Sequence, residues 1–88
     1  MTEILIKRLS KTVSIPKYET TGSSGMDLAA DINEKIEIKP GETQIIPTGL
    51  SVSIPKEFEI QIRPRSGLAA KYQLSVLNTP GTIDADYR

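Results

Sequence analysis

An all-β fold is predicted for this chain, a jelly-roll-like sandwich or barrel with one short helix, from three observations on the sequence. Apolar and polar residues alternate with period two, best seen where Phe58, Ile60 and Ile62 interleave with charged or amide side chains, as in half-buried strands. Proline and glycine separate the alternating runs, as at Pro40–Gly41, where the backbone is expected to turn. Only Ser66–Tyr72 has helical character, and 88 residues are enough for one domain. Frequent short strands with so little helix are typical of sandwiches and barrels.

The expected strands follow one another along the first two thirds of the chain. Alternating apolar residues predict strands at Ile4–Ile6, Val13–Ile15, Ile36–Ile38, Thr43–Ile46, Leu50–Ile54 and Phe58–Ile62. The last two should pair as a hairpin about Pro55–Lys56. The helix that follows should begin with Ser66 as its N-cap, because a serine hydroxyl accepts a hydrogen bond from the first turn.

Composition excludes several classes of function. Eleven basic and eleven acidic residues cancel without forming a block of one sign, so we expect no nucleic acid polymer and no membrane as partner. Cysteine is absent, which excludes disulfides, thiolate metal sites and a cysteine nucleophile. Histidine is absent too, so a general base would be a carboxylate, a lysine or a tyrosine. The first apolar run is too short for a signal peptide or a membrane span, which predicts a soluble, cytoplasmic protein.

The segment Arg63–Ala69 (RPRSGLA) could bind phosphate. It joins the end of an expected strand to the start of the expected helix, where backbone N–H groups are free. A hydroxyl, a glycine that permits close approach and a nearby guanidinium suit phosphate oxygens. The alternative is that Ser66 is only a cap and Gly67 only a turn residue.

The segment 74–87 is expected to form a strand, a turn and a strand. Leu74–Leu77 and Thr82–Tyr87 would flank the turn Asn78–Gly81, with Gly81 supplying a positive φ. Period two would place Asp84 and Asp86 on one face, where like charges raise the pKa of one carboxyl and suit it to general base catalysis. The alternative is that both carboxylates are simply solvated.

A third segment, Ser24–Ala30 (SGMDLAA), combines a glycine bend with one acid. Asp27 could orient a metal-bound water or could cap a turn, and the spacing alone does not decide between them.

Together and in this order, the segments Ser24–Ala30, Arg63–Ala69 and Asn78–Arg88 (NTPGTIDADYR) resemble the first three motifs of the trimeric deoxyuridine triphosphate pyrophosphatase (dUTPase) family. Ser24 stands where the family usually has alanine. At Arg88 the third motif would normally continue into Gly-Glu. Two further motifs, one of them a Gly-rich arm with a phosphate-binding arginine, do not appear. We therefore expect residues 1–88 to form a dUTPase-like β domain that is incomplete at its C-terminus.

The resemblance implies a function, a cofactor and a set of site residues. The protein would hydrolyse dUTP to dUMP and pyrophosphate, which limits uracil incorporation into DNA and supplies the dTMP precursor. It would use Mg²⁺ and would form a homotrimer in the complete protein. Asp84 would activate the water that attacks the α-phosphorus, and the role of Asp86 stays open. The remaining site residues implied are Asn78, Gly81 and Ile83 for uracil, Tyr87 for deoxyribose, Arg65, Ser66 and Gly67 for the phosphates, and Asp27 for a metal-bound water.

Two alternatives remain at this point. A dCTP deaminase relative would have a similar fold and its own phosphate segment, although Pro64–Gly67 and Ile83–Tyr87 match the dUTPase wording better. The second alternative is a non-catalytic dUTPase-like module, which binds nucleotide without hydrolysing it.

Overall fold

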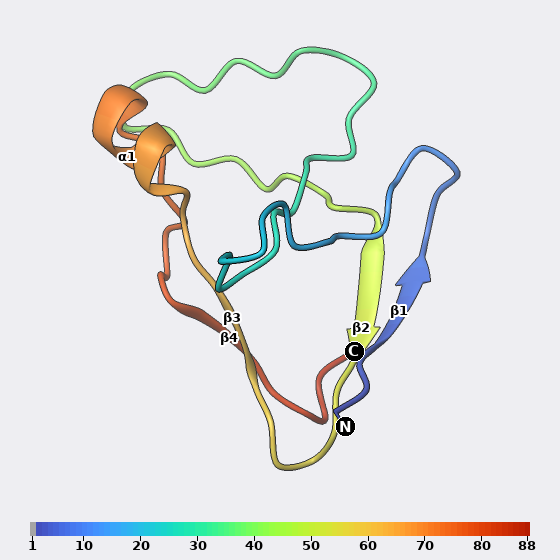
Figure 1. Cartoon of the computed structure of the whole chain (residues 1–88). Coiled ribbons are helices and arrows are strands. Elements are labelled where there is room, and N and C mark those ends of the chain that lie inside the picture. The colour runs from blue at the N-terminus through green and yellow to red at the C-terminus, as the bar shows by residue number, and fades with distance from the viewer. Residues whose placement is uncertain (1) are drawn as a thin grey trace. The chain divides into compact units, whose positions relative to one another are not determined.

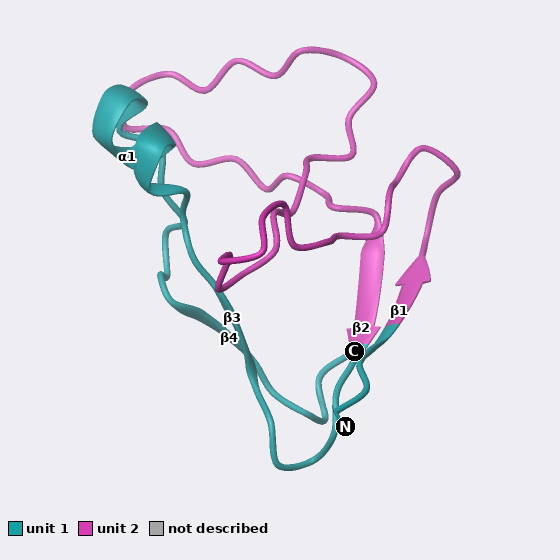
Figure 2. Cartoon of the chain, in the orientation of Figure 1, with its two compact units in different colours: residues 1–5, 53–88 teal, residues 6–52 magenta. Residues whose placement is uncertain are grey.

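Within residues 2–88, which the computed structural model describes, the chain forms four short strands and one helix (Figure 1). In chain order they are β1 (Leu5–Arg8), β2 (Leu50–Ser53), β3 (Ile60–Ile62), α1 (Ser66–Tyr72) and β4 (Gly81–Ile83). Figure 2 divides the chain into two compact units. The first unit comprises Ser53–Arg88 with the initial residues through Leu5, and the second comprises Ile6–Val52.

The sheet formed by β1 and β2 lies largely within the second unit. The N–H of Leu9, just after β1, donates a 2.7 Å hydrogen bond to the carbonyl of Gly49, just before β2. The end of β1 therefore lies beside the start of β2, so the two strands are antiparallel. The long connection between them holds a turn at Pro40–Gly41, closed by a 2.9 Å bond from Glu42 N–H to the Lys39 carbonyl, and Gly41 has φ +83° as the sequence predicted for this turn.

The first unit is organised by the antiparallel pairing of β3 with β4. Ile60 faces Ile83, Gln61 faces Thr82, and Ile62 faces Gly81. Helix α1 and the loop after it connect the two strands (Figure 1). The helix ends at Gln73, which has a left-handed conformation with φ 57° and donates its N–H to the Ala69 carbonyl.

Neither unit has a substantial apolar core of its own. Among the described residues the buried apolar side chains are Val13, 9% exposed, and Ile54, 8% exposed. Most other large apolar side chains lie in water to some degree, and Ile45 is 97% exposed. Each such side chain contributes little to stability here, because hydrophobic free energy scales with the apolar area removed from water.

These elements confirm a mainly β chain with one short helix, and α1 has the predicted bounds. The predicted strands near Ile4–Ile6, Leu50–Ile54 and Phe58–Ile62 are present, shifted or shortened by one or two residues. The predictions of strands at Val13–Ile15, Ile36–Ile38, Thr43–Ile46 and Leu74–Leu77 are wrong for the structure described. A period-two pattern reports which face a strand would bury, but a strand forms only where a neighbour completes its hydrogen bonds. The jelly-roll arrangement stays a prediction.

Three local predictions also need correction. Leu50–Ile54 and Phe58–Ile62 do not pair as a hairpin, since β2 pairs with β1 and β3 with β4, although a turn does bring Phe58 N–H to the Pro55 carbonyl at 3.0 Å. The N-cap of α1 is Arg65, not Ser66, and no side chain caps it. Gly81 does not have a positive φ, and the peptide bond before Pro80 in the preceding turn is cis.

Candidate active site

The segment after β3 places a short row of backbone donors at the start of α1. Arg65 is extended, with φ −75° and ψ 128°, and its carbonyl accepts the helical hydrogen bond from Ala69 N–H at 3.0 Å. The N–H groups of Ser66, Gly67 and Leu68 precede that bond, so they have no intrahelical acceptor. All three residues are exposed. Backbone donors arranged in this way can bind phosphate oxygens.

Gly67 is not needed by the fold of the chain itself. A methyl group built on it meets nothing within 4 Å, and its φ lies outside the left-handed region. Because neither strain nor a neighbour excludes a side chain, the fold does not account for glycine here. A glycine here would permit close approach of a ligand to the backbone.

The turn before β4 brings two more of the candidate residues together. Thr79 N–H donates to the Val76 carbonyl at 3.2 Å, which places Asn78 inside a tight turn. Gly81 is buried opposite Ile62, and a methyl group on it would lie 3.6 Å from the Asn78 amide nitrogen and 3.7 Å from Ile62 Cβ. The Asn78 side chain therefore lies against the first residue of β4.

Asp84 follows β4 and begins a turn. The prediction that Asp84 and Asp86 lie on one face of a strand is therefore wrong. The strand ends at Ile83, and Tyr87 N–H donates to the Asp84 carbonyl at 3.1 Å. Arg88 Nη1 closes the turn by donating to the carbonyls of Ala85, at 2.9 Å, and Tyr87, at 2.8 Å. Alternation along a strand therefore no longer relates the two carboxylates.

Asp84 and the aromatic ring that follows it are open to solvent in the chain. Asp84 is exposed, and Tyr87 is 65% exposed. The ring therefore has a face on which a ligand could stack, and the Asp84 carboxylate could accept a proton from a nearby water.

The register of the β3–β4 ladder sorts the candidate residues into two groups. Ile62 faces Gly81, so the phosphate segment after β3 and the Asn78 turn before β4 lie at one end of the ladder. Ile60 faces Ile83, so the turn from Asp84 to Tyr87 lies at the other end, beyond which the chain reaches its C-terminus (Figure 1). A rise of ~3.3 Å per residue separates Asp84 from Gly81 by roughly 10 Å along the strand direction.

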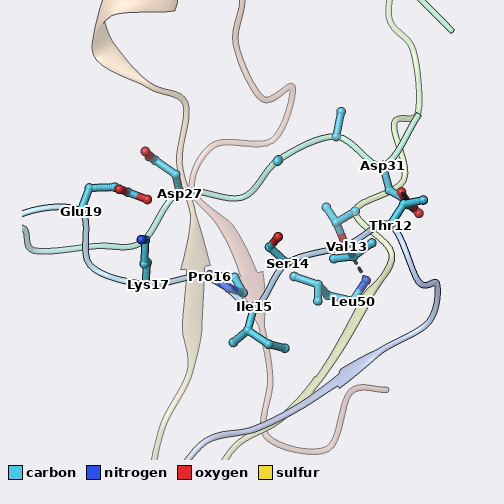
Figure 3. Close-up of a pocket in the computed structure, with 13 residues that line it drawn as sticks. Thr12, Val13, Ser14, Ile15, Pro16, Lys17, Glu19, Asp27, Asp31 and Leu50 are labelled. Atoms are coloured by element: carbon cyan, nitrogen blue, oxygen red, sulfur yellow. Dashed lines mark hydrogen bonds between the residues drawn. The ribbon is translucent and has the colours of Figure 1, made fainter. Parts of the chain in front are cut away.

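Asp27 belongs to the second unit, where it lines a pocket of about 280 Å³ (Figure 3). Lys17 and Glu19 are its labelled neighbours at one side of the pocket, while Thr12 and Asp31 lie at the other. The pocket is lined by Thr12, Val13, Ser14, Ile15, Pro16, Lys17, Glu19, Asp27, Ala29, Ala30, Asp31, Thr48 and Leu50. Asp27 is the one predicted site residue that it holds.

Nothing in residues 2–88 forms a ready-made cage for a metal ion, since no three acidic side chains converge. Asp27 is an exposed oxygen donor. In the same part of the chain, no helix has the length and apolarity needed to cross a membrane.

Sequence reasoning missed a polar cluster beside this pocket. Asp31 accepts hydrogen bonds from Ser10 Oγ at 3.0 Å and Thr12 Oγ1 at 2.6 Å. Gly49 has φ +70°, and a methyl group on it would lie 2.7 Å from Asp31 Oδ2 and would also collide with Val13 Cγ2. The Pro47–Gly49 turn composition was the available signal for the glycine. Nothing in the spacing marked Asp31.

Comparison with known proteins identifies the family. The dUTPase family profile matches residues 11–88, which include all three motifs and every candidate site residue. The chain belongs to the dUTPase family. A deoxyuridine 5′-triphosphate nucleotidohydrolase of Fusobacterium nucleatum is 59% identical over 76 residues, covering 86% of this chain and 52% of that protein. Proteins of the same name from Desulfotalea psychrophila and Rickettsia felis are 56% identical over 81 residues and 54% identical over 89 residues.

The dUTPase relatives extend well beyond the matched region. The match covers 92% of this chain and 54% of the Desulfotalea protein, and 100% of this chain and 60% of the Rickettsia protein. The chain thus spans little more than half the length of these curated relatives. None of the three carries a deaminase name.

Proposed function

We propose that this chain supplies uracil-, sugar- and phosphate-binding residues to an enzyme that hydrolyses dUTP to dUMP and pyrophosphate. The observation that carries the proposal is the dUTPase match over residues 11–88, which includes all three chemistry-bearing segments. The structure adds that two of these segments, after β3 and before β4, meet at one end of a single ladder. Such an enzyme would limit uracil in DNA and supply the dTMP precursor. A cytoplasmic location remains our prediction.

The uracil ring would bind along β4, through Asn78, Gly81 and Ile83. Within the described residues β4 pairs on one edge only, with β3, so backbone N–H and C=O groups on its other edge remain available. Alternating donors and acceptors of this kind can match the edge of a pyrimidine base. Buried Gly81 has the Asn78 amide beside it, and in the proposed complex the residues around the base would accept uracil and exclude the methyl group of thymine.

The sugar and phosphates would bind at the flanking turns. Tyr87, exposed after the turn that begins at Asp84, would lie flat against the deoxyribose and exclude a 2′-hydroxyl. Arg65 would pair with phosphate oxygens, while the free N–H groups of Ser66 and Gly67 would donate to them. Asp84 would take a proton from water as that water attacks the α-phosphorus.

Mg²⁺ would neutralise charge on the triphosphate and raise the electrophilicity of phosphorus when bound. Asp27 would hold the position of one water in the ion's shell by accepting its hydrogen bond. Its exposed carboxylate and its place at a pocket support this role, and no further protein ligand is required for an ion bound largely through phosphate and water.

A homotrimer in the complete protein is also part of the proposal. Two observations support association. Asp84 and the phosphate segment lie at opposite ends of the β3–β4 ladder within one chain, and large apolar side chains such as Leu77 and Ile45 are exposed. Covering such exposed apolar side chains with another surface would be favourable, because apolar area would leave water.

The decisive experiment compares Asp84→Asn with Asp86→Asn in the complete protein. Loss of the proton acceptor should lower dUTP turnover by ~10²-fold or more in Asp84→Asn, with dUTP binding kept, because the shape of the residue is preserved. The neighbouring substitution serves as the matched control and should cost much less. Unchanged turnover in Asp84→Asn would remove Asp84 from the mechanism, and equal losses in the two variants would show that the effect is not specific to Asp84. Release of ammonia from dCTP would instead indicate a deaminase. Tight dUTP binding without turnover would indicate a binding module.

A further inference from the structure

Asp31 stands out among the acidic residues of the chain. Ten of the eleven are exposed, and Asp31 alone is partly buried. Its two carboxylate oxygens accept hydrogen bonds from different hydroxyls, Oδ2 from Ser10 at 3.0 Å and Oδ1 from Thr12 at 2.6 Å. Burying part of a carboxylate costs free energy unless such donors compensate it, so this arrangement is a built feature of the second unit.

The backbone around Asp31 is fixed as well. Its N–H donates to the Pro47 carbonyl at 2.8 Å, and its carboxylate occupies the space that a side chain at Gly49 would fill. One residue thus ties together the turn after β1, the segment that ends at Asp31 and the segment that leads into β2. Because each carboxylate oxygen of Asp31 accepts a bond from a hydroxyl on the turn after β1, Asp31 acts as a clamp between these segments.

The clamp joins one end of each of two segments that line the pocket. The segment 12–17 starts at Thr12, and the segment 27–31 ends at Asp31. The two segments are joined by the Thr12–Asp31 hydrogen bond, and both line the same pocket (Figure 3). Neither segment contains a helix or a strand. Their mutual placement therefore depends on individual side-chain and backbone bonds rather than on a regular ladder, and Asp27 sits at the far end of the second segment.

We propose that Asp31 is a positioning residue, which through its clamp on Ser10 and Thr12 sets the direction of the segment 27–31 and thereby the place of the Asp27 carboxylate at the pocket. This rests on the proposed function in so far as Asp27 orients a metal-bound water. Placement of Asp27 in the absence of metal and nucleotide does not depend on that function.

The test replaces the clamp in three ways in the purified protein. Asp31→Leu keeps the approximate size and removes both acceptors, and Asp31→Asn keeps one acceptor and can donate to the other hydroxyl. Thr12→Val keeps Asp31 and removes the shorter bond to it, together with the 2.9 Å hydrogen bond between Thr12 Oγ1 and Ser10 Oγ. Thr43→Val, at an exposed residue outside the pocket, is the matched control for Thr12→Val. All are measured first without Mg²⁺ or nucleotide, by backbone amide chemical shifts and hydrogen exchange at residues 27–30.

The expected result is that Asp31→Leu and Thr12→Val shift the amide signals at Asp27 and Leu28 and speed their exchange, while Asp31→Asn and Thr43→Val leave them nearly unchanged. With Mg²⁺ and dUTP, the Mg²⁺ concentration for half-maximal turnover should rise ~10-fold or more in the first two variants, the cost typical of a lost group that orients a metal-site residue.

Unchanged amides at residues 27–30 in a folded Asp31→Leu protein would overturn the proposal, as would an Asp31→Asn variant as disturbed as Asp31→Leu. If Asp31→Leu does not fold, Thr12→Val decides by the same criteria. A wild-type protein that hydrolyses no dUTP would count against the proposed function alone, because the metal-free measurements still report on the clamp. Disturbed amides with unchanged Mg²⁺ dependence would reject the link to the metal shell.

Discussion

Substituting Gly49 by alanine should destabilise the second unit more than the same change at any other glycine. Two separate costs add at this position. Its φ of +70° lies in the left-handed region, where a non-glycine residue costs ~1–2 kcal/mol. The new methyl group would also lie 2.7 Å from Asp31 Oδ2 and collide with Val13, one of the buried apolar side chains, and overpacking of that kind costs ~1–3 kcal/mol. The sum, about 2 to 5 kcal/mol, approaches the whole stability of a small domain.

Other glycines of the chain separate these two costs. Gly41 has φ +83° but nothing within 4 Å of a built methyl group, so Gly41→Ala should show the backbone cost alone, ~1–2 kcal/mol. Gly22 has neither feature, and Gly22→Ala should stay within ~0.5 kcal/mol of the parent. Urea unfolding followed by circular dichroism gives the free energies, and hydrogen exchange of peptides from residues 6–52 locates the change. Equal losses for Gly49→Ala and Gly41→Ala would refute the argument from Val13 and Asp31.

Three further substitutions test the first unit. Gln73→Gly should raise the free energy of unfolding by ~0.5–1 kcal/mol, because Gln73 follows α1 with φ 57°, a conformation that glycine adopts without strain. The control Gln73→Ala should not raise it, and equal melting temperatures of the two variants would contradict the prediction. Gly67→Ala should leave stability unchanged or higher, since the methyl group meets open space, yet lower dUTP hydrolysis ~10-fold or more by displacing a phosphate oxygen; full activity would exclude close approach there. Tyr87→Ala should raise the ratio of UTP to dUTP hydrolysis, and a constant ratio would show that its ring does not select the sugar.

Features that depend on a few neighbouring residues were predictable from the sequence. The turn at Pro40–Gly41 and helix α1 form where expected because proline, glycine and helix-forming residues act within one or two turns of backbone. Segments such as Ile36–Ile38 and Leu74–Leu77 carry an equally clear pattern but form no strand. Their pattern specifies a partner surface, and within the described residues no strand pairs with them.

The candidate site shows the same difference between features set by neighbouring residues and features set by distant ones. The sequence motifs predicted which residues form the candidate site. The structure brings Asn78 close to Gly81 through the turn that the Thr79–Val76 hydrogen bond closes. The spacing did not predict the relation of Asp84 to Asp86, because that inference assumed a strand which in fact ends at Ile83. Asp31 was not predictable at all, since its hydroxyl donors lie about twenty residues away in sequence, beyond the reach of any local pattern.

The β3–β4 ladder explains how the segments proposed to bind nucleotide are held together without a large core. Its three paired positions fix the relative register of the Arg65–Gly67 segment and the Asn78 turn, and a slip of one residue would turn every side chain of β4 to the opposite face. Gly81 lies opposite Ile62 at this end of the ladder, with the Asn78 side chain beside it. The relative position of the two segments at this end is therefore set by the register of the ladder. The distance of Asp84 from the same end is set by the length of β4, so in the proposed mechanism the ladder alone would not bring Asp84 to the residues proposed to bind phosphate.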